Sequence, residues 1–331
     1  MLTDNIIELN RDVEPLIIQG AATRTEFFKQ KFDDSFKPLQ FVHCSDMHDR
    51  LDLWNRMVEY TNHYRDYLSF VIHTGDYCGS RQEEYTDLYN DGIHCERPIY
   101  PCVGNHDTYI TPKWVKHTKK SAYDLLFAPF KLDGLNFMEG DFSMTYYRDF
   151  PESNIRLAVL DEYYDTDRQC EWLVGLLDEA RAKNICVLTA MHEPSDNVND
   201  SFGVTFHTMN DYVSLLGRLT KHPFEPIIAD FIAKGGRHIC NLVGHEHHDL
   251  FGMTDAGVLN SAVPSGTCWD GWCDSKRIKG TRTFDCFNIV CVDANLGLLK
   301  IVRVGNNRDH YLRSQRSLCY DYVNRRVIFN D

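Results

Sequence analysis

Residues 237–249 read RHICNLVGHEHHD, an apolar run that ends in a glycine and a cluster of histidines. The run from Ile239 to Val243 is short and nearly continuous, which is typical of a buried strand. His245, His247 and His248 follow it. A core histidine usually occurs singly, and a surface tag would not follow a buried strand. The stretch therefore indicates a metal site at a strand end, although one motif alone does not decide the matter.

Four other apolar runs also end in side chains that can bind metals or transfer protons. These are Asp46 and His48 in FVHCSDMHD, Asp76 in FVIHTGD, Asn105, His106 and Asp107 in YPCVGNHD, and His192 in CVLTAMHEP. Each cluster alone has an ordinary interpretation, because an Asp before a helix is more often an N-cap than a ligand. Together, all five fall at carboxyl ends of predicted strands, where an open α/β sheet places its ligand site.

Helical patterns alternate with these strands. The segment 51–67 has apolar residues at helical spacing, and further helices are predicted over 83–92, 121–130, 167–183 and 226–234. Additional strands are predicted over 144–150 and 154–161. The alternation predicts a layered α/β protein with helices on both faces of a sheet.

The last third of the chain changes character. Strands are predicted over 257–266, 281–293 and 298–305, with DANLG as a hairpin turn. This pattern predicts a second, mostly antiparallel sheet packed on the first. Since no Pro/Gly/Ser-rich linker intervenes, residues 38–305 are expected to form one domain. Residues 1–37 would be an N-terminal extension of unassigned role, and 306–331 a C-terminal tail that packs on the domain or extends it.

Composition narrows the possible environments and partners. The chain has 331 residues, of which 43% are hydrophobic, and a net charge of −13. The start does not resemble a signal peptide, and no apolar run reaches 18 residues, so we expect a cytoplasmic protein without membrane insertion. The twelve cysteines contain no CxxC pair, which favours free thiols. The acidity works against nucleic acid as a partner. The oligomeric state stays open.

The ordered motifs DMH, GD, GNHD, a lone His after a strand, and GHEH resemble those of the calcineurin-like metallophosphoesterase family. The resemblance covers about 41–248, with the antiparallel strands beyond. It implies a four-layer α/β/β/α sandwich of two mixed sheets flanked by helices. It also implies a binuclear metal centre at the strand ends, and hence a metal-dependent hydrolase of small-molecule phosphate esters.

Carried over by motif, the resemblance implies a ligand set for each ion. The first ion would be held by Asp46, His48, Asp76 and His247, and the second by Asp76, Asn105, His192 and His245. Two divalent ions about 3.5 to 4 Å apart can share a carboxylate and a bridging hydroxide that attacks phosphorus. Nitrogen-rich sites suit first-row ions such as Mn, Fe, Co, Ni or Zn.

Two residues of GNHD would act beside these ligands. His106, beside the second ion, is expected to protonate the leaving group or to stabilise the transition state. Asp107 is expected to shape the site, and an ordinary turn residue is the alternative. The protein serine/threonine phosphatases carry Asp and Arg where this chain has Gly79 and Ser80. The purple acid phosphatases carry Tyr at the position of Gly79. With His48 in the first motif and Asp107 after GNH, the pattern is more similar to the phosphodiesterase and nuclease-like branch, which favours diesters over monoesters.

Aromatic residues are the candidates for substrate contact. Trp269 and Trp272 lie in a predicted loop, where they could stack on a sugar or base or fill a gap between sheets. Tyr109 follows GNHD directly. Two other functions stay open: a nuclease of the same fold, which would need a basic groove, and a non-catalytic protein-binding member. Loss of ligands would mark the latter, and none of the seven ligand positions is lost.

Overall fold

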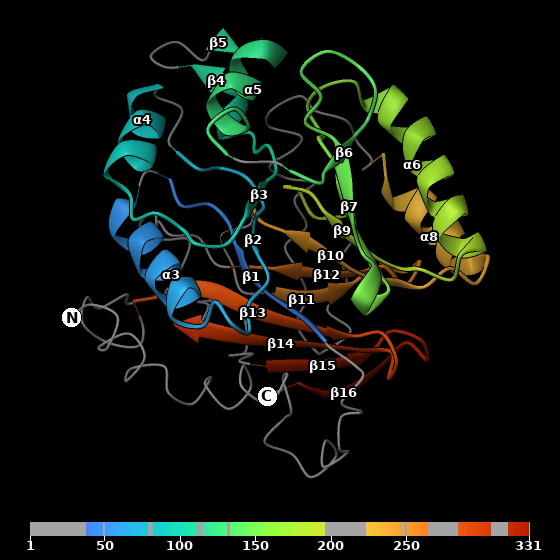
Figure 1. The fold of residues 1–331 in the computed structure, drawn as a ribbon. Coiled ribbons are helices and arrows are strands. Elements are labelled where there is room, and N and C mark those ends of the chain that lie inside the picture. The colour runs from blue at the N-terminus through green and yellow to red at the C-terminus, as the bar shows by residue number, and fades with distance from the viewer. Residues whose placement is uncertain are drawn as a thin grey trace.

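A computed structural model describes residues 38–48, 50–78, 82–110, 115–116, 118–130, 133–195, 223–245, 247, 250–263, 284–305 and 317–330. It contains two seven-stranded sheets with helices on their outer sides (Figure 1). The predicted sandwich of two mixed sheets flanked by helices is confirmed.

The first sheet joins the two ends of the described chain. Its strand order is β16-β15-β14-β13-β1-β2-β3. The strands are β1 (Leu39–Cys44), β2 (Val71–His73), β3 (Ile99–Pro101), β13 (Cys286–Asp293), β14 (Leu298–Gly305), β15 (Ser317–Asp321) and β16 (Arg326–Asn330). The strands β1, β2 and β3 run parallel, whereas β13 to β16 form an antiparallel meander whose first strand pairs with β1.

The second sheet has the order β11-β12-β10-β9-β8-β7-β6. Its strands are β6 (Asn136–Phe137), β7 (Tyr146–Phe150), β8 (Ile155–Val159), β9 (Cys186–Ala190), β10 (His238–Val243), β11 (Leu250–Met253) and β12 (Leu259–Ala262). Its four central strands β8, β9, β10 and β12 run parallel. A small separate hairpin pairs β4 (Tyr109–Ile110) with β5 (Val115–Lys116).

One expectation about the sheets was wrong. The strands of the last third do not form a second sheet of their own, because β13 to β16 continue the sheet of β1 and β12 joins β10. All six residues of β1 are buried, and β13 covers the edge of β1 that β2 leaves open. Apolar patterning identifies such a strand as central, but it does not identify the strand that pairs with it.

Helices cover the outer faces of the sheets (Figure 1). The helix α3 (Leu51–His63) contacts β13, while α6 (Thr166–Ala182) and α8 (Glu225–Ala233) contact β9, β10 and each other. The other α-helices in the described ranges are α4 (Gln82–Asp91) and α5 (Lys119–Leu126). In α6, Leu173, Leu176, Leu177 and Ala180 recur at helical spacing and are buried against the sheet. No helix in the described ranges is long and apolar enough to span a membrane.

The arrangement brings the carboxyl ends of strands from both sheets together. Within the first sheet, the N–H of Asp46 donates to the carbonyl of Gly75 at 3.0 Å. Between the sheets, the N–H of His245 donates to a carboxylate oxygen of Asp46 at 2.9 Å. Loops that lie about 200 residues apart in the sequence therefore meet at one edge of the sandwich.

Candidate metal centre

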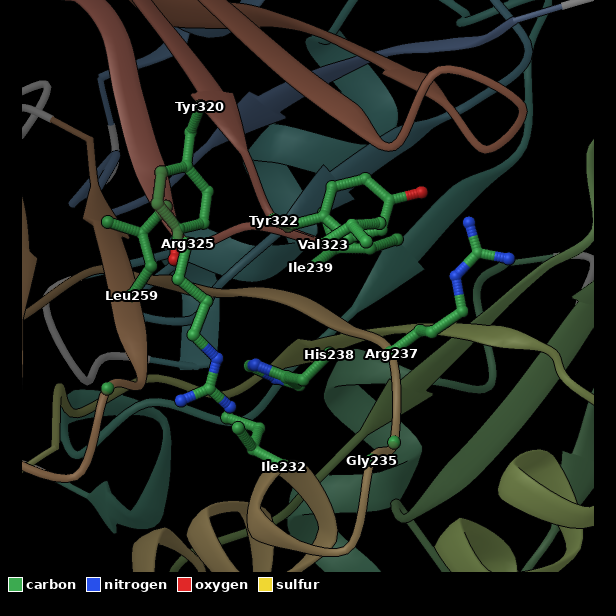
Figure 2. A pocket seen from close by; sticks show the side chains of 12 residues that line it. Ile232, Gly235, Arg237, His238, Ile239, Leu259, Tyr320, Tyr322, Val323 and Arg325 are labelled. Atoms are coloured by element: carbon green, nitrogen blue, oxygen red, sulfur yellow. The ribbon is translucent and has the colours of Figure 1, made fainter.

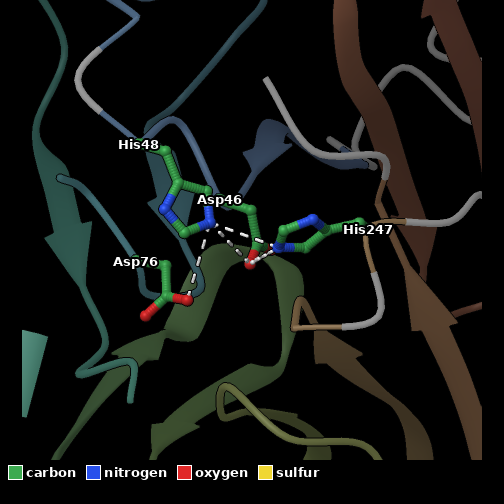
Figure 3. Close-up of side chains that lie close together, drawn as sticks. All are labelled: Asp46, His48, Asp76 and His247. Atoms are coloured by element: carbon green, nitrogen blue, oxygen red, sulfur yellow. Dashed lines mark hydrogen bonds and ion pairs between the residues drawn. The ribbon is translucent and has the colours of Figure 1, made fainter. Parts of the chain in front are cut away.

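The first group consists of Asp46, His48, Asp76 and His247 (Figure 3). One potential ligand atom from each of these side chains lies within 4.8 Å of all the others. Nε2 of His247 lies 3.3 Å from Oδ1 of Asp46 and 3.2 Å from Nε2 of His48. The two carboxylates are fully buried, whereas His247 is partly exposed, so the group is reached from solvent on the His247 side.

The second group shares Asp76 with the first and adds His192 and His245. Nε2 of His192 lies 3.4 Å from Oδ2 of Asp76 and 3.1 Å from Nδ1 of His245. The amide oxygen of Asn105 completes the cluster, at 3.0 Å from His192 Nε2 and 2.7 Å from His245 Nδ1. The structure thus brings together all seven predicted side chains, in the same two groups that the family resemblance implies.

The donor atoms fit divalent metal ions. Carboxylate oxygens, an amide oxygen and imidazole nitrogens converge, and such atoms accept rather than donate in their metal-binding forms. Nδ1 of His192 contacts the carbonyl oxygen of Thr74 at 2.6 Å and must donate to it, which leaves Nε2 to face the cluster. Metal-bound histidines commonly use their second nitrogen in this way. Nitrogen and oxygen ligands in these numbers suit first-row ions.

Electrostatics in the cluster also favour a cation. Burial opposes ionisation of Asp46 and Asp76, yet neighbouring histidines keep the pKa of both carboxyl groups below the ordinary value. Burial likewise lowers the pKa of His192, but the charge of Asp76 outweighs it and raises the pKa well above the ordinary value. The paired carboxylates therefore attract positive charge to the place where the histidine nitrogens meet.

Comparison with known proteins identifies the family. The sequence model of the family described as "Calcineurin-like phosphoesterase" matches residues 39–249, which is more than half of the chain. The chain belongs to the calcineurin-like phosphoesterase family. A search of curated proteins gave no match.

Several solved structures resemble this phosphoesterase at low identity. One is a dimetal phosphatase from Danio rerio, with 12% identity, coverage of 81% of this chain and 96% of that chain, and a TM-score of 0.49. Another is GAP50, the anchor in the inner membrane complex of Plasmodium, with 13% identity, coverage of 84% and 88%, and a TM-score of 0.48. A third is TT1561 of Thermus thermophilus, with 9% identity, coverage of 80% and 99%, and a TM-score of 0.42.

The backbone of the phosphoesterase centre is strained at the predicted ligands. Five of the seven residues have positive φ angles, namely Asp46, His48, Asp76, His245 and His247, with values between 43° and 65°. The left-handed conformation costs about 1 to 2 kcal/mol for a residue with a side chain. Such strain is typical of functional sites, where the surrounding fold holds a side chain in a required direction.

Two motif glycines make room for the ligands. Gly75 of the GD motif has a φ angle of 97°, and a Cβ atom there would lie 2.5 Å from Nδ1 of His192. A Cβ atom at Gly104 of the GNHD motif would lie 2.2 Å from Oδ1 of Asp76. Both distances are too short for real contacts. The glycines of these motifs therefore allow the strand-end loops to pack against the ligand side chains.

Asp107 is buried and acts on the backbone of the loops. Its carboxylate accepts hydrogen bonds from the N–H groups of Asp76, Tyr77 and Gly104 and from the hydroxyl of Tyr85. Burial, reinforced by the charge of Asp76, raises the pKa of Asp107 to about 7. This geometry agrees with the shaping role that was expected for Asp107. Sequence reasoning missed Tyr85 on α4, because no local pattern connects it to GNHD.

His106 lies at the edge of the centre. Its backbone N–H donates to Oδ1 of Asp76 at 2.8 Å, and its half-buried ring packs edge-on against His48, with centroids 4.7 Å apart. We expected the His106 ring to lie beside the second group, but the ring contacts His48, which is a member of the first group. The backbone bond to Asp76 and the ring contact with His48 fix its position at this edge.

Two glutamates beside His192, Glu162 and Glu193, were not predicted as part of the site. Oε2 of Glu162 accepts hydrogen bonds from the backbone N–H groups of His192 and Glu193, both at 2.8 Å. The hydroxyl of Tyr163 donates to Glu193 at 2.9 Å. Glu162 follows β8, so the strand-end rule that identified the other clusters could have identified it too.

Some predicted residues lie outside the described ranges. Trp269, Trp272 and the positions of the missing phosphatase motif, Gly79 and Ser80, are among them. Tyr109 lies in β4, and only its backbone is described. The substrate contacts expected of Trp269, Trp272 and Tyr109 stay predictions.

Proposed function

We propose that this chain is a binuclear metal-dependent phosphoesterase that prefers phosphodiesters of small molecules. The observation that supports this proposal most directly is the sharing of Asp76 by two groups of ligand-type side chains. In the proposal, Asp46, His48 and His247 would hold the first ion, Asn105, His192 and His245 would hold the second, and Asp76 would serve both. Mn, Fe, Co, Ni and Zn are the candidate ions.

The protein residues hold and orient these groups. When bound, two divalent ions polarise a phosphoryl oxygen and activate a water molecule as nucleophile. Asn105 contributes a neutral oxygen, which limits the negative charge that an anionic substrate meets. The hydrogen bond from His192 Nδ1 to Thr74 fixes the direction of its Nε2 atom. His106 is proposed to donate a proton to the leaving oxygen or to stabilise charge in the transition state, an effect worth about 10²- to 10⁴-fold in rate.

The charge around the centre supports the preference for diesters. Glu162 lies against the backbone of His192, and Glu193 follows that residue directly. A phosphomonoester approaches two negative charges at neutral pH, because the second pKa of phosphate is about 6. A phosphodiester keeps only one charge. Carboxylates beside the second group would offset part of the positive charge of two bound ions, which weakens the attraction of a doubly charged monoester more than that of a singly charged diester.

The test compares two chromogenic substrates. The purified full-length chain is stripped of metal, reloaded separately with Mn, Zn, Ni, Co or Fe, and assayed with bis-p-nitrophenyl phosphate and p-nitrophenyl phosphate. We expect metal-dependent cleavage with the diester preferred, abolished by Asp76→Asn and reduced about 10²-fold or more by His106→Ala. The matched control is His63→Ala, which removes an exposed histidine at the end of α3 and should leave activity unchanged.

Each contrary result has a defined meaning. A preference for p-nitrophenyl phosphate would contradict the diester proposal and leave a monoesterase. Faster cleavage of single-stranded DNA than of any small diester would indicate a nuclease. A folded protein that binds two ions and cleaves nothing would favour the non-catalytic, protein-binding alternative.

The cytoplasmic location is proposed on composition alone. The free state of the ten described cysteines is compatible with a reducing compartment. Fractionation of cells that express the tagged chain tests this location.

A further inference from the structure

A cavity of ≈ 140 Å³ is lined by the side chains drawn in Figure 2. Its walls come from the end of α8, the start of β10, the turn before β12 and the hairpin between β15 and β16. His238 is the first residue of β10 and lines the cavity. The metal-centre residue His245 lies beyond the other end of the same strand. Since a strand rises about 3.3 Å per residue, the two sites lie roughly 20 Å apart.

Two arginines bring positive charge to the cavity. Arg237 and Arg325 both line it, and no Asp or Glu is among the lining residues. Arg325 is exposed and forms no ion pair within the described part of the chain. Arg237 donates to the carbonyl oxygen of Ala294 at 2.7 Å, and its guanidinium lies 6.0 Å from the ring centre of Tyr322. A carbonyl leaves the charge of a guanidinium uncompensated. Figure 2 shows the guanidinium of Arg237 on the Tyr322 side, away from His238, whereas that of Arg325 lies on the side of His238, so Arg325 is the cation that faces an anion there.

His238 adds a hydrogen-bond acceptor. The amide nitrogen of Asn241 donates to Ser195 and Asn260, which leaves its amide oxygen to accept the hydroxyl proton of Thr189. The hydroxyl of Thr189 has no second proton to donate. In the contact of 2.9 Å between the Thr189 oxygen and Nε2 of His238, the histidine must therefore be the donor, so Nε2 carries the hydrogen. The neutral His238 ring therefore carries its lone pair on Nδ1. A ligand hydroxyl can donate to that atom.

The remaining walls are largely apolar and held in place. Tyr320 and Tyr322 are almost completely buried, and the hydroxyl of Tyr322 donates to Sγ of Cys186 at 3.4 Å. Ile239 and Leu259 are buried beside them. A cavity of about 150 Å³ accommodates a molecule the size of benzene. The space thus suits one small molecule with a compact ring or short carbon chain.

The backbone at Arg325 is also unusual. Its φ angle is 54°, a conformation that glycine or asparagine commonly supplies in a turn. Nη1 of Arg325 lies so close to Gly257 that a Cβ atom there would be 3.0 Å away. The hairpin and the turn before β12 thus confine this guanidinium at the cavity.

We propose that this cavity is a second ligand site, which binds a small oxyanion that carries a hydroxyl group, such as a hydroxycarboxylate of three carbons. Arg325 neutralises the anion, Nδ1 of His238 accepts a hydrogen bond from the ligand hydroxyl, and the tyrosine rings contact the carbon skeleton. The proposal does not depend on the activity of the metal centre.

The test uses full-length Asp76→Asn protein treated with a chelator, so that phosphate cannot bind to metal ions. Isothermal titration calorimetry measures the binding of glycerate, lactate, inorganic phosphate and glycerol. We expect glycerate or lactate to bind, and the uncharged glycerol not to bind. Adding Arg325→Gln should weaken that binding roughly tenfold or more, since it removes a charged hydrogen bond. The matched control is Arg326→Gln, because Arg326 pairs with Asp321 and does not line the cavity.

Three results would overturn the proposal. One is the absence of binding by all three anions. Another is equal loss of affinity in the Arg325→Gln and Arg326→Gln variants, which would indicate unspecific attraction to the hairpin. The third is binding of inorganic phosphate as tightly as of the hydroxylated anions, together with no effect of His238→Gln, which would exclude recognition of hydroxyl groups. Far-UV circular dichroism of each variant establishes that the fold is intact.

Discussion

Oδ2 of Asp107 accepts a hydrogen bond of 2.8 Å from the backbone N–H of Asp76. The same oxygen accepts the N–H of Gly104, also at 2.8 Å. One buried carboxylate therefore joins the loop after β2 to the loop after β3, and each loop carries a proposed metal ligand. Asp107, which is not a proposed ligand, thus holds the backbone of Asp76, the ligand that both groups share.

Replacement of Asp107 by Asn should loosen both loops. An amide has one acceptor oxygen, so its NH₂ group would face two of the four donors that the carboxylate now satisfies. We expect a loss of about 1 to 3 kcal/mol in the free energy of unfolding, and lower metal retention. Urea unfolding and metal analysis measure the two effects. Tyr85→Phe removes one donor but keeps the carboxylate, and should cost about 1 kcal/mol without loss of metal. A fall in kcat with unchanged metal content and stability would instead indicate that Asp107 acts directly on the substrate.

The same substitution at two glycines should have opposite effects. Gly75→Ala places a methyl group 2.7 Å from Cα of Gly104 at a φ angle of 97°, and should lower both stability and metal retention. Gly175 lies inside α6, and a Cβ atom added there would have nothing within 4 Å. Gly175→Ala should therefore raise the free energy of unfolding by about 0.5 to 1 kcal/mol. Denaturant unfolding of both variants tests this contrast, and a stable Gly75→Ala protein with full metal content would contradict the packing argument.

Metal stoichiometry should distinguish the shared ligand from the others. We expect about two ions per chain in the wild-type protein, from the two-metal centre proposed. His245→Asn should empty the second group and His247→Asn should weaken the first, while Asp76→Asn should deplete both. Asparagine is chosen because it tolerates the positive φ angles at these positions. Elemental analysis after gel filtration gives the ratios. Retention of one full ion by Asp76→Asn would show that this carboxylate is not shared.

The sequence was informative where function depends on strand ends. The clusters that contain the seven predicted ligands could be selected because each follows an apolar run, and parallel strands deliver such residues to one edge. The family resemblance then implied which members of these clusters are ligands. The pairing of β13 with β1 could not be predicted, since an apolar run does not indicate which strand pairs with it. The contacts of Tyr85 with Asp107 and of Gly104 with Asp76 also depend on packing between distant segments.

The cavity at the start of β10 could not be predicted from the sequence, for a similar reason. Arg237 and Arg325 are ordinary surface-type residues in sequence, and the segments that carry them meet only in the folded chain. The family motifs concern the opposite end of β10, so they say nothing about His238. Function at strand ends is local enough to be inferred from patterns, whereas a site formed by four unrelated segments requires coordinates.

His238 connects the stability of the fold to pH. Burial, aided by the charge of Arg325, lowers the pKa of His238 to about 3, whereas the unfolded chain keeps the ordinary value of about 6.5. Below pH 6.5 the unfolded chain therefore binds a proton that the folded chain does not bind until about pH 3. The stabilisation from the neutral ring is complete above pH 6.5 and is lost progressively as the pH falls toward 3. At pH 5 the loss amounts to about 2 kcal/mol.

His238→Gln should remove this dependence. Glutamine can still donate to the hydroxyl of Thr189, but it does not titrate. Between pH 7.5 and pH 5, the free energy of unfolding of the metal-free variant should fall by about 2 kcal/mol less than that of the metal-free wild-type protein. Urea unfolding at both pH values gives the four free energies. His63→Gln, at an exposed position, should behave like wild type. If His238→Gln and wild type lose equal stability over this interval, His238 is protonated in the folded protein and the neutral ring assigned to the cavity is incorrect.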